Sequence, residues 1–355
     1  MPSPKPPQLF GIHELYRPAN SAPEVDIVAV HGLNGDRLRT WTTQSGSSQV
    51  CWLSRPEFLP RYIPGARVLT WGYNANVSSF GSKVASSERL LQHAQTLVAQ
   101  LCSDRDLDNA SERPIIFVCH SLGGIVVKKA LAYSASRTFS QLTHLQSIYT
   151  CTFALLFLGT PHHGSPKARL LHTMTKLASF AVPNAALSLS TALIQILESE
   201  SGVLQDVTAA FVPLMPHFRV FFFWEQHKTD LKYTRDFIVE ESSAAPIIDN
   251  TERCGIAADH REMCRFEKSN DPGFQTVIAA LKRYAHEAPS VVAERCRTAH
   301  EVLEDERDWQ AGELRIQPVP SEYAQAPLAP PPYEKEIKLS QRTDSLVIKP
   351  AWQGE

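Results

Sequence analysis

One stretch decides the fold of this chain: IIFVCHSLGGIVV, residues Ile115–Val127. Its first five residues are apolar or small and prone to form strands, as in a strand buried within a sheet. Two glycines and a helix-like run ending near Tyr133 follow Ser121. The stretch therefore predicts a strand, a sharp turn and a helix, with the hydroxyl of Ser121 at the apex. Small neighbours are needed there because the backbone is crowded where helix and strand pack closely.

The residues around Ser121 follow the pattern G-x-S-x-G with one departure, because Cys119 stands at the first glycine position. Cysteine is small enough to fit there. The pattern is that of the nucleophile elbow of α/β-hydrolases, which lifts a serine off the sheet edge toward a substrate. A serine that caps a helix is the alternative interpretation. The strand before Ser121 and the helix after it favour the elbow.

A serine nucleophile needs a base, and the base needs an orienting carboxylate. In this fold the acid and then the histidine follow the serine along the chain. His260 lies in a loop-like stretch just before the helical run Phe274–Tyr284, where the base is expected. His286 and His300 lie too far into a polar helix and tail. His260 is therefore the predicted base, with a solvated loop histidine as the alternative.

The acid is expected at the carboxyl end of a late strand, where active-site groups of open α/β sheets collect. Residues 217–225 are strand-prone and nearly continuous in apolar side chains, and Glu225 is the first carboxylate at their end. Glu225 is the predicted acid, with an exposed strand-end charge as the alternative. The competing carboxylates are Asp230, Glu240, Glu241, Asp249 and, less suited because it adjoins His260, Asp259.

The oxyanion of such a reaction needs backbone N–H donors. One is expected from Leu122, directly after the nucleophile, and the other from the loop after an earlier strand. That strand is Val25–Val30, and the loop His31–Asp36 contains two glycines that let the backbone turn its amides toward a ligand. The amide of Leu33, or of Gly32, is the predicted second donor. An ordinary Gly-rich turn is the alternative.

Five motifs now stand in order along the chain: VHGLNGD (30–36), VLTWGY (68–73), CHSLGGIVVK (119–128), LFLGTPHHGS (156–165) and ADH (258–260). Together they resemble the serine-esterase/lipase group of α/β-hydrolases, which includes the SERAC-like proteins and fungal hydrolase domains often fused to nucleotide-binding receptors. Related inositol-deacylase-like and yeast lipase-like proteins share the first, third and fourth motifs. The resemblance covers roughly residues 8–287 and implies a triad of Ser121, Glu225 and His260.

The fourth motif follows the apolar strand Thr152–Leu158 and is expected at the sheet edge that carries Ser121. The residues predicted around the substrate pocket are His31, Gly32, His120, His162 and His163. One alternative is that these histidines only support the site through hydrogen bonds, and a metal site built from them is the other. Metal sites need defined ligand geometry, and no H-x-x-x-H or C-x-x-C pairing is present. No metal or other cofactor is therefore expected.

Strands and helices alternate along the chain, which predicts an α/β fold with a mostly parallel sheet covered on both faces. The expected strands are 25–30, 67–72, 114–119, 152–158, 218–224 and, more weakly, 237–239. The expected helices are 79–101, 124–134 and 272–286.

Residues 1–24 are predicted to form a Pro-rich arm and residues 25–287 the α/β-hydrolase domain. Within that domain, residues 166–215 are expected to form a small helical lid. Leu177–Leu197 carries no charge, but its many polar residues make it weakly apolar for a membrane span. A core or surface helix pair is the alternative to the lid. An apolar lid would suit a lipid-like substrate and contact with a membrane surface.

Residues 288–355 are predicted to form a charged helix and then a disordered Pro-rich tail. Pro330-Pro331-Pro332-Tyr333 matches the P-P-x-Y ligand of WW domains, which makes such a domain a predicted partner.

The bulk composition is that of a folded globular enzyme. The chain has 355 residues, 43% of them hydrophobic and 20% charged. Its net charge of −2 gives no electrostatic reason to expect nucleic acid as a partner. Seven cysteines without regular spacing argue against a disulfide framework, and Met1–Pro7 has no apolar signal region. An intracellular protein is expected, cytoplasmic or peripheral on endoplasmic reticulum or mitochondrial membranes.

These features predict a serine hydrolase that cleaves an ester of an apolar or lipid-like acyl group through an acyl-enzyme. The same acyl-enzyme would also serve an acyltransferase or a thioesterase. A non-catalytic interaction module that works through the Pro-rich tail is the remaining alternative, against which the complete triad argues.

Overall fold

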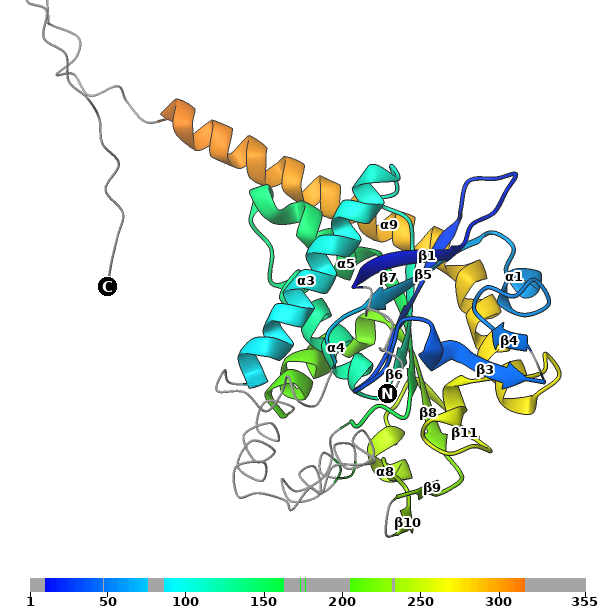
Figure 1. Cartoon of the computed structure of the whole chain (residues 1–355). Coiled ribbons are helices and arrows are strands. Elements are labelled where there is room, and N and C mark those ends of the chain that lie inside the picture. The colour runs from blue at the N-terminus through cyan, green and yellow to red at the C-terminus, as the bar shows by residue number, and fades with distance from the viewer. Residues whose placement is uncertain are drawn as a thin grey trace, which may run out of the picture. The chain divides into compact units, whose positions relative to one another are not determined.

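The structure, a computed structural model, describes residues 10–46, 48–75, 86–162, 173, 176, 205–231 and 234–316. The chain forms two compact units, Met1–Leu303 and Glu304–Glu355. The central sheet lies in the first unit (Figure 1).

A seven-stranded sheet forms the centre of the first unit, in the order β1-β5-β2-β6-β7-β8-β11. All neighbouring strands run parallel except β1, which pairs antiparallel with β5. The strands are β1 (Gly11–Tyr16), β2 (Val25–Val30), β5 (Ala66–Gly72), β6 (Ile115–His120), β7 (Thr152–Leu158), β8 (Arg219–Glu225) and β11 (Thr251–Ile256). This is the predicted α/β-hydrolase fold, with a mostly parallel sheet.

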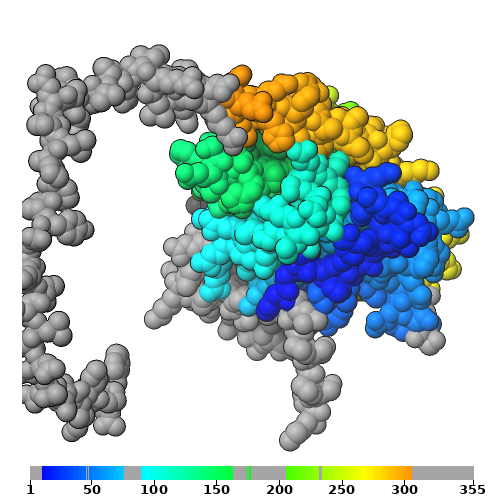
Figure 2. Space-filling model, turned by 90° about the horizontal axis from the view of Figure 1, so that it is seen from above, coloured from blue at the N-terminus to red at the C-terminus, as the bar shows by residue number. Residues whose placement is uncertain are grey.

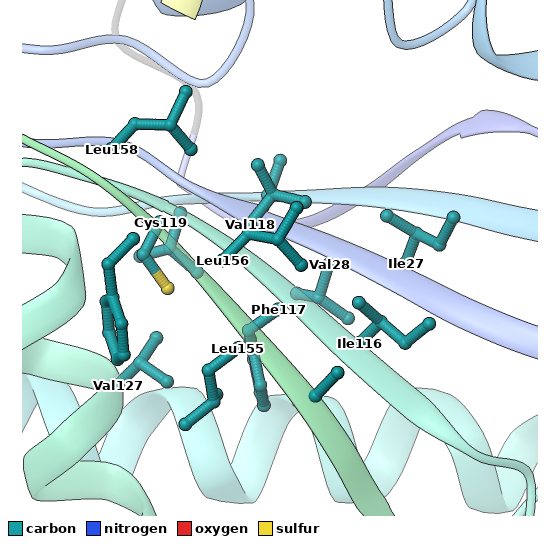
Figure 3. Packing of buried hydrophobic residues seen from close by; sticks show 14 of the residues in the cluster. Ile27, Val28, Ile116, Phe117, Val118, Cys119, Val127, Leu155, Leu156 and Leu158 are labelled. Atoms are coloured by element: carbon teal, nitrogen blue, oxygen red, sulfur yellow. The ribbon is translucent and has the colours of Figure 1, made fainter. Parts of the chain in front are cut away.

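The central strands carry the core of the molecule. Every residue of β2, β5, β6 and β7 is buried, because helices cover both faces of the sheet. Val28 of β2, Phe117 of β6 and Leu155 of β7 stand in register across three strands and pack together (Figure 3). Burial on both faces explains why these strands appear in the sequence as continuous apolar runs.

Helices and a hairpin cover the sheet. Figure 1 shows α3, α4 and α5 together on one side of it, with α1, the β3–β4 hairpin and the first turns of α9 on the other. The main helices are α3 (Ser86–Leu107), α4 (Leu122–Ala135), α5 (Thr143–Cys151) and α9 (Pro272–Ile316). The shorter elements are η1 (Arg39–Trp41), β3 (Thr42–Ser45), β4 (Ser48–Cys51), α1 (Leu59–Tyr62), η2 (Ser140–Leu142), η3 (Val212–His217), β9 (Thr229–Asp230), β10 (Arg235–Asp236), α8 (Glu241–Ala244) and η4 (Glu262–Cys264).

The strong strand predictions are confirmed, and the weak one is wrong. The bounds of β2, β5, β6, β7 and β8 agree with the predicted ranges to within one residue. Residues 237–239 form no strand; the backbone there instead supplies an N–H to Glu225. The last parallel strand is β11, an edge strand in which only Ile256 is buried, so its sequence lacks the apolar run of a buried strand.

The N-terminal arm differs from its prediction, because residues 11–16 form the edge strand β1 of the main sheet. In the view of Figure 2 this strand lies at the surface beside α3, and α5 and α9 follow beyond it. The predicted boundary at residue 287 also falls inside an element, since α9 continues through Pro289 to Ile316. A proline inside a helix removes one hydrogen bond, and the residues on either side of it, Ala288 and Val292, are fully buried.

Several predictions concern residues outside the described part of the chain. Most of the predicted lid and the tail beyond Ile316 are among them, as are residues 79–85 of the predicted helix 79–101, which is described from Ser86 and extends to Leu107. Among the described residues, no helix is long and apolar enough to cross a membrane.

Candidate active site

Ser121 occupies the sharp turn between β6 and α4. Its backbone has φ 53° and ψ −126°, a conformation that residues with a Cβ rarely adopt, so the turn is strained. The two following glycines make the turn possible. A Cβ on Gly123 would collide with the carbonyl oxygens of Val30 and His31, and a Cβ on Gly124 would collide with the side chain of Thr160. The predicted nucleophile elbow is therefore the local structure.

His260 lies between Ser121 and Glu225. Its Nε2 is 3.0 Å from Oγ of Ser121, and its Nδ1 is 3.1 Å from Oε2 of Glu225. The three side chains are buried, with 2% or less of each residue exposed. The other carboxylate oxygen of Glu225, Oε1, accepts a hydrogen bond from the Val239 N–H at 2.8 Å. The acid is thus held from one side by the backbone and faces the imidazole with its other oxygen.

The parallel sheet explains how residues so far apart in sequence meet. Ser121 follows β6 and Glu225 ends β8, while His260 lies just after β11, so all three stand at the carboxyl edge. Three of the five competing carboxylates are engaged elsewhere. Asp230 pairs with Arg235 and Glu241 with Arg253, and Oδ1 of Asp259 accepts the N–H groups of Arg261 and Glu262.

The loop after β2 approaches the elbow closely at Gly32. A Cβ on Gly32 would lie 2.7 Å from Cβ of Ser121 and 3.3 Å from the nitrogen of Leu122. Within the described ranges, neither the Leu33 nor the Leu122 N–H has an acceptor in the protein. The two predicted oxyanion donors therefore lie on segments that meet beside Ser121, and the described part of the fold uses neither of them.

His31, predicted as a pocket residue, holds this loop in place. Its Nδ1 lies 3.0 Å from the Gly32 carbonyl oxygen, and its Nε2 lies 3.4 Å from the Tyr73 N–H. Since the Tyr73 amide can only donate, Nε2 accepts and Nδ1 carries the proton. The ring also stacks on Tyr73, with centroids 4.5 Å apart. Burial lowers the pKa of His31 to about 4, so the neutral ring that this arrangement requires is the form present at neutral pH.

His120 has a similar supporting position. Its Nε2 lies 2.8 Å from the carbonyl oxygen of His260 and must donate to it. Burial, with a smaller contribution from nearby His260, lowers the pKa of His120 to about 3, so it is neutral as well. This hydrogen bond fastens the backbone of His260 to the strand that leads into the nucleophile.

His162 contacts the segment before β11. Its backbone N–H donates to the Ser243 carbonyl at 2.7 Å, and Oγ of Ser243 donates back to the His162 carbonyl at 3.1 Å. Its ring meets Phe157 and Phe222 edge to face. His163 lies outside the described residues. No group of three His, Cys, Asp or Glu within the described residues could hold a metal ion.

Sequence reasoning missed Gly159 and Thr160, which lie between the triad members. Oγ1 of Thr160 donates to the Ser121 carbonyl at 2.9 Å, and a Cβ on Gly159 would lie 2.9 Å from Cε1 of His260. The signal was present, because both residues belong to the motif after β7. The prediction from this motif named only its histidines, His162 and His163.

The comparisons with known proteins support a hydrolase. Residues 27–192 match the family described as "Putative serine esterase (DUF676)". This match confirms the resemblance predicted from the motifs and supports a hydrolase. It includes Ser121 and ends before Glu225 and His260, so the geometry alone brings those two residues to the site.

The curated relatives found are forms of Protein SERAC1. The Danio rerio protein is 25% identical over 269 residues, which cover 71% of this chain and 38% of that protein. The Bos taurus protein is 24% identical over 170 residues, which cover 44% of this chain and 24% of that protein. The chain thus spans well under half the length of these relatives. Among solved structures, the Bacillus licheniformis lipase BlEst2 is similar over 77% of this chain and 99% of that one, at 18% identity and a TM-score of 0.47.

Proposed function

We propose that this protein is a serine hydrolase that cleaves carboxylic esters through an acyl-enzyme. One observation carries the proposal: Oγ of Ser121 lies 3.0 Å from Nε2 of His260, whose Nδ1 lies 3.1 Å from Glu225. A serine with a positioned base and a base with a positioned carboxylate form the arrangement that activates a hydroxyl for attack. The match to the serine-esterase family supports the same reaction class.

In the first half of the reaction, Oγ of Ser121 attacks the ester carbonyl while Nε2 of His260 takes the hydroxyl proton. Glu225 stabilises the imidazolium that forms and keeps Nδ1 protonated. The N–H groups of Leu33 and Leu122 receive the negative charge on the carbonyl oxygen. Each such donor contributes about 3 kcal/mol in comparable sites. His260 then gives its proton to the alcohol, which leaves as the ester bond breaks.

In the second half, water attacks the acyl-enzyme and His260 takes a proton from it. Collapse of the second tetrahedral intermediate breaks the bond between the acyl group and Oγ, and His260 returns the proton to Ser121. An alcohol in the place of water would give a new ester, which is the acyltransferase reaction. A thioester in the place of the ester would follow the same steps.

The chemical class of the acyl group is the finer part of the proposal. We propose an apolar or lipid-like acyl chain, because the predicted lid over residues 166–215 contains the uncharged stretch Leu177–Leu197. We also propose contact of this lid with a membrane surface, an intracellular location, and binding of a WW domain at Pro330–Tyr333. A pull-down with isolated WW domains, using the full chain and a Tyr333→Ala variant, tests the last of these.

The main test uses a fluorophosphonate probe together with p-nitrophenyl esters of graded chain length. Wild type should be labelled and active, and Ser121→Ala and His260→Ala should lose both properties. Ser103→Ala and His144→Ala are matched controls, since both residues are exposed on helices α3 and α5, and they should behave like wild type. Folded wild-type protein that neither labels nor hydrolyses any ester would contradict the proposal. A preference for short acyl chains would remove the lipid-like substrate only.

A further inference from the structure

We propose that Thr160 is a positioning residue for the reaction, acting with Gly159 to hold the nucleophile and the base in register. The inference rests on the proposed function. It concerns the start of the motif after β7, which borders Ser121 on one side and His260 on the other.

The chain at the end of β7 fixes both backbone polar groups of Ser121. The Ser121 N–H donates to the Leu158 carbonyl at 2.9 Å, and Oγ1 of Thr160 donates to the Ser121 carbonyl at 2.9 Å. A residue with φ 53° keeps that conformation only when its surroundings hold it there. Among the described residues, the Gly124 N–H also donates to this carbonyl, at 3.1 Å.

Gly159 brings the same segment against the base. Its φ is 60°, and a Cβ there would lie 2.9 Å from Cε1 and 3.0 Å from Nδ1 of His260. The lack of a side chain therefore lets the imidazole rest on the backbone. The Gly159 N–H also donates to the Phe223 carbonyl at 2.9 Å, on the strand that carries Glu225. Residues 158–160 thus connect the strand of the acid, the ring of the base and the backbone of the nucleophile.

The role of Thr160 depends on its hydroxyl and not only on its volume. Thr160 is fully buried, and its Oγ1 and Cγ2 fill the space that the missing Cβ of Gly124 leaves. Valine would fill the same space and leave the Ser121 carbonyl with one donor fewer. The strained turn would then relax, and Oγ of Ser121 would move relative to Nε2 of His260. Misplacement of a reacting atom by about 1 Å can cost about 100-fold in rate.

The same strand offers a matched control at its other end. Thr152 is also fully buried, and its hydroxyl also donates to a backbone carbonyl, that of Ile148. It stands at the amino edge of the sheet, away from the triad. Thr152→Val and Thr160→Val therefore remove the same type of hydrogen bond from the two ends of β7, and only the second bond touches the nucleophile.

The experiment measures kcat and KM for a p-nitrophenyl ester, the rate of fluorophosphonate labelling and the thermal unfolding of each variant. Thr160→Val should lower kcat and the labelling rate by about 10- to 100-fold with little change in KM. Thr160→Ser, which keeps the hydroxyl, should restore most of the rate. Thr152→Val should lose about as much thermal stability as Thr160→Val and keep the wild-type kcat.

Three results would overturn the positioning role: a wild-type kcat in Thr160→Val, an equal loss in Thr160→Ser, or an equal loss of kcat in Thr152→Val. Failure of the proposed function gives a different result. In that case wild type itself would not be labelled, or Ser121→Ala would retain the activity, and the positioning role would fall with it.

Discussion

The two edges of the central sheet are built on different principles. At the amino edge, Asp26 of β2 is completely buried and pairs with three arginines: Arg67 at 2.8 Å, Arg105 at 2.6 Å and Arg113 at 3.0 Å. At the carboxyl edge, buried Glu225 faces His260, and the neighbouring rings of His31 and His120 are neutral. The amino edge is a network of charged side chains. The carboxyl edge has one buried carboxylate, and the neutral histidines near it form hydrogen bonds to the backbone.

The comparison indicates that the amino edge stabilises the fold and that the carboxyl edge holds the groups available for a reaction. At the amino edge each charge has partners, which leaves little capacity to bind anything else. The carboxyl edge keeps a strained serine and two backbone N–H groups that have no acceptor within the described residues. Such spare donors and strain have a cost for stability, and they collect where a ligand is to be bound. The contrast can be tested by substitutions at each edge.

The largest effect is expected from Glu225→Gln at the carboxyl edge. An amide presents an N–H as readily as an oxygen to Nδ1 of His260, so the imidazole can take the wrong tautomer and its charged form loses its counter-charge. The kcat for a p-nitrophenyl ester should fall about 1,000- to 10,000-fold. Glu241→Gln is the control, because that carboxylate pairs at the surface with Arg253. A loss below tenfold would mean that another carboxylate is the acid.

The next largest effect is expected from Asp26→Asn, now on stability. The substitution leaves three arginines close together without their shared anion, and breaking a buried ion pair costs about 3–5 kcal/mol. Urea unfolding should show this loss, while the kcat of the folded protein stays at the wild-type value. Asp230→Asn is the control, because its pair with Arg235 is exposed and contributes about 1 kcal/mol or less. Equal effects of the two substitutions would contradict the assignment of stability to the amino edge.

The sequence predicted the elements that depend on local pattern. Buried parallel strands such as Thr152–Leu158 could be predicted because they are apolar at every position. Edge strand β1 could not, because residues 11–16 are half-buried and mixed in polarity, and their place depends on pairing with β5. The strand β11 was missed for the same reason, since its partner β8 defines it more than its own residues do.

The site residues could be predicted where a local sequence pattern marks them. Ser121 has the glycines that its turn requires, and Glu225 and His260 stand at strand ends where the chemistry needs them. The hydrogen-bond partners of His31 and His120 were not predictable, because tertiary packing decides which group a buried histidine contacts. The hydroxyl of Thr160 is a further case, since its acceptor lies 39 residues away.

A smaller effect is expected at Lys128, a cation that lacks the partners found at the amino edge. It is buried on α4 with Nζ 5.6 Å and 5.7 Å from the ring centroids of Phe157 and Phe211, and no carboxylate pairs with it in the described part of the chain. Burial lowers its pKa from 10.5 to about 7. Because the folded pKa is the lower one, the penalty is complete below about pH 7 and fades as the pH rises toward 10.5.

Lys128→Met should therefore raise the free energy of unfolding by about 2–4 kcal/mol at pH 6 and by much less at pH 10. Attraction of the ammonium group to the two rings offsets part of the penalty. Urea unfolding at pH 6, 8 and 10 measures the change, with neighbouring, half-buried Lys129→Met as the control. A gain that is the same at every pH would assign it to packing and not to the charge.

The smallest effect concerns the strain assigned to the carboxyl edge. Ser121→Gly and Ser121→Ala both remove the nucleophile, so any difference between them reports the backbone. At φ 53° glycine should be more stable than alanine by about 1 kcal/mol. At Ser136, which has φ −81° at the end of the same helix, glycine should be less stable than alanine. Glycine there only adds entropy to the unfolded chain. Thermal unfolding of the four variants compares the two sites. If glycine is more stable than alanine at position 121 and less stable at position 136, the strain lies at the elbow. If alanine is the more stable variant at both positions, the turn of Ser121 costs the fold nothing, and the two edges differ in charge alone.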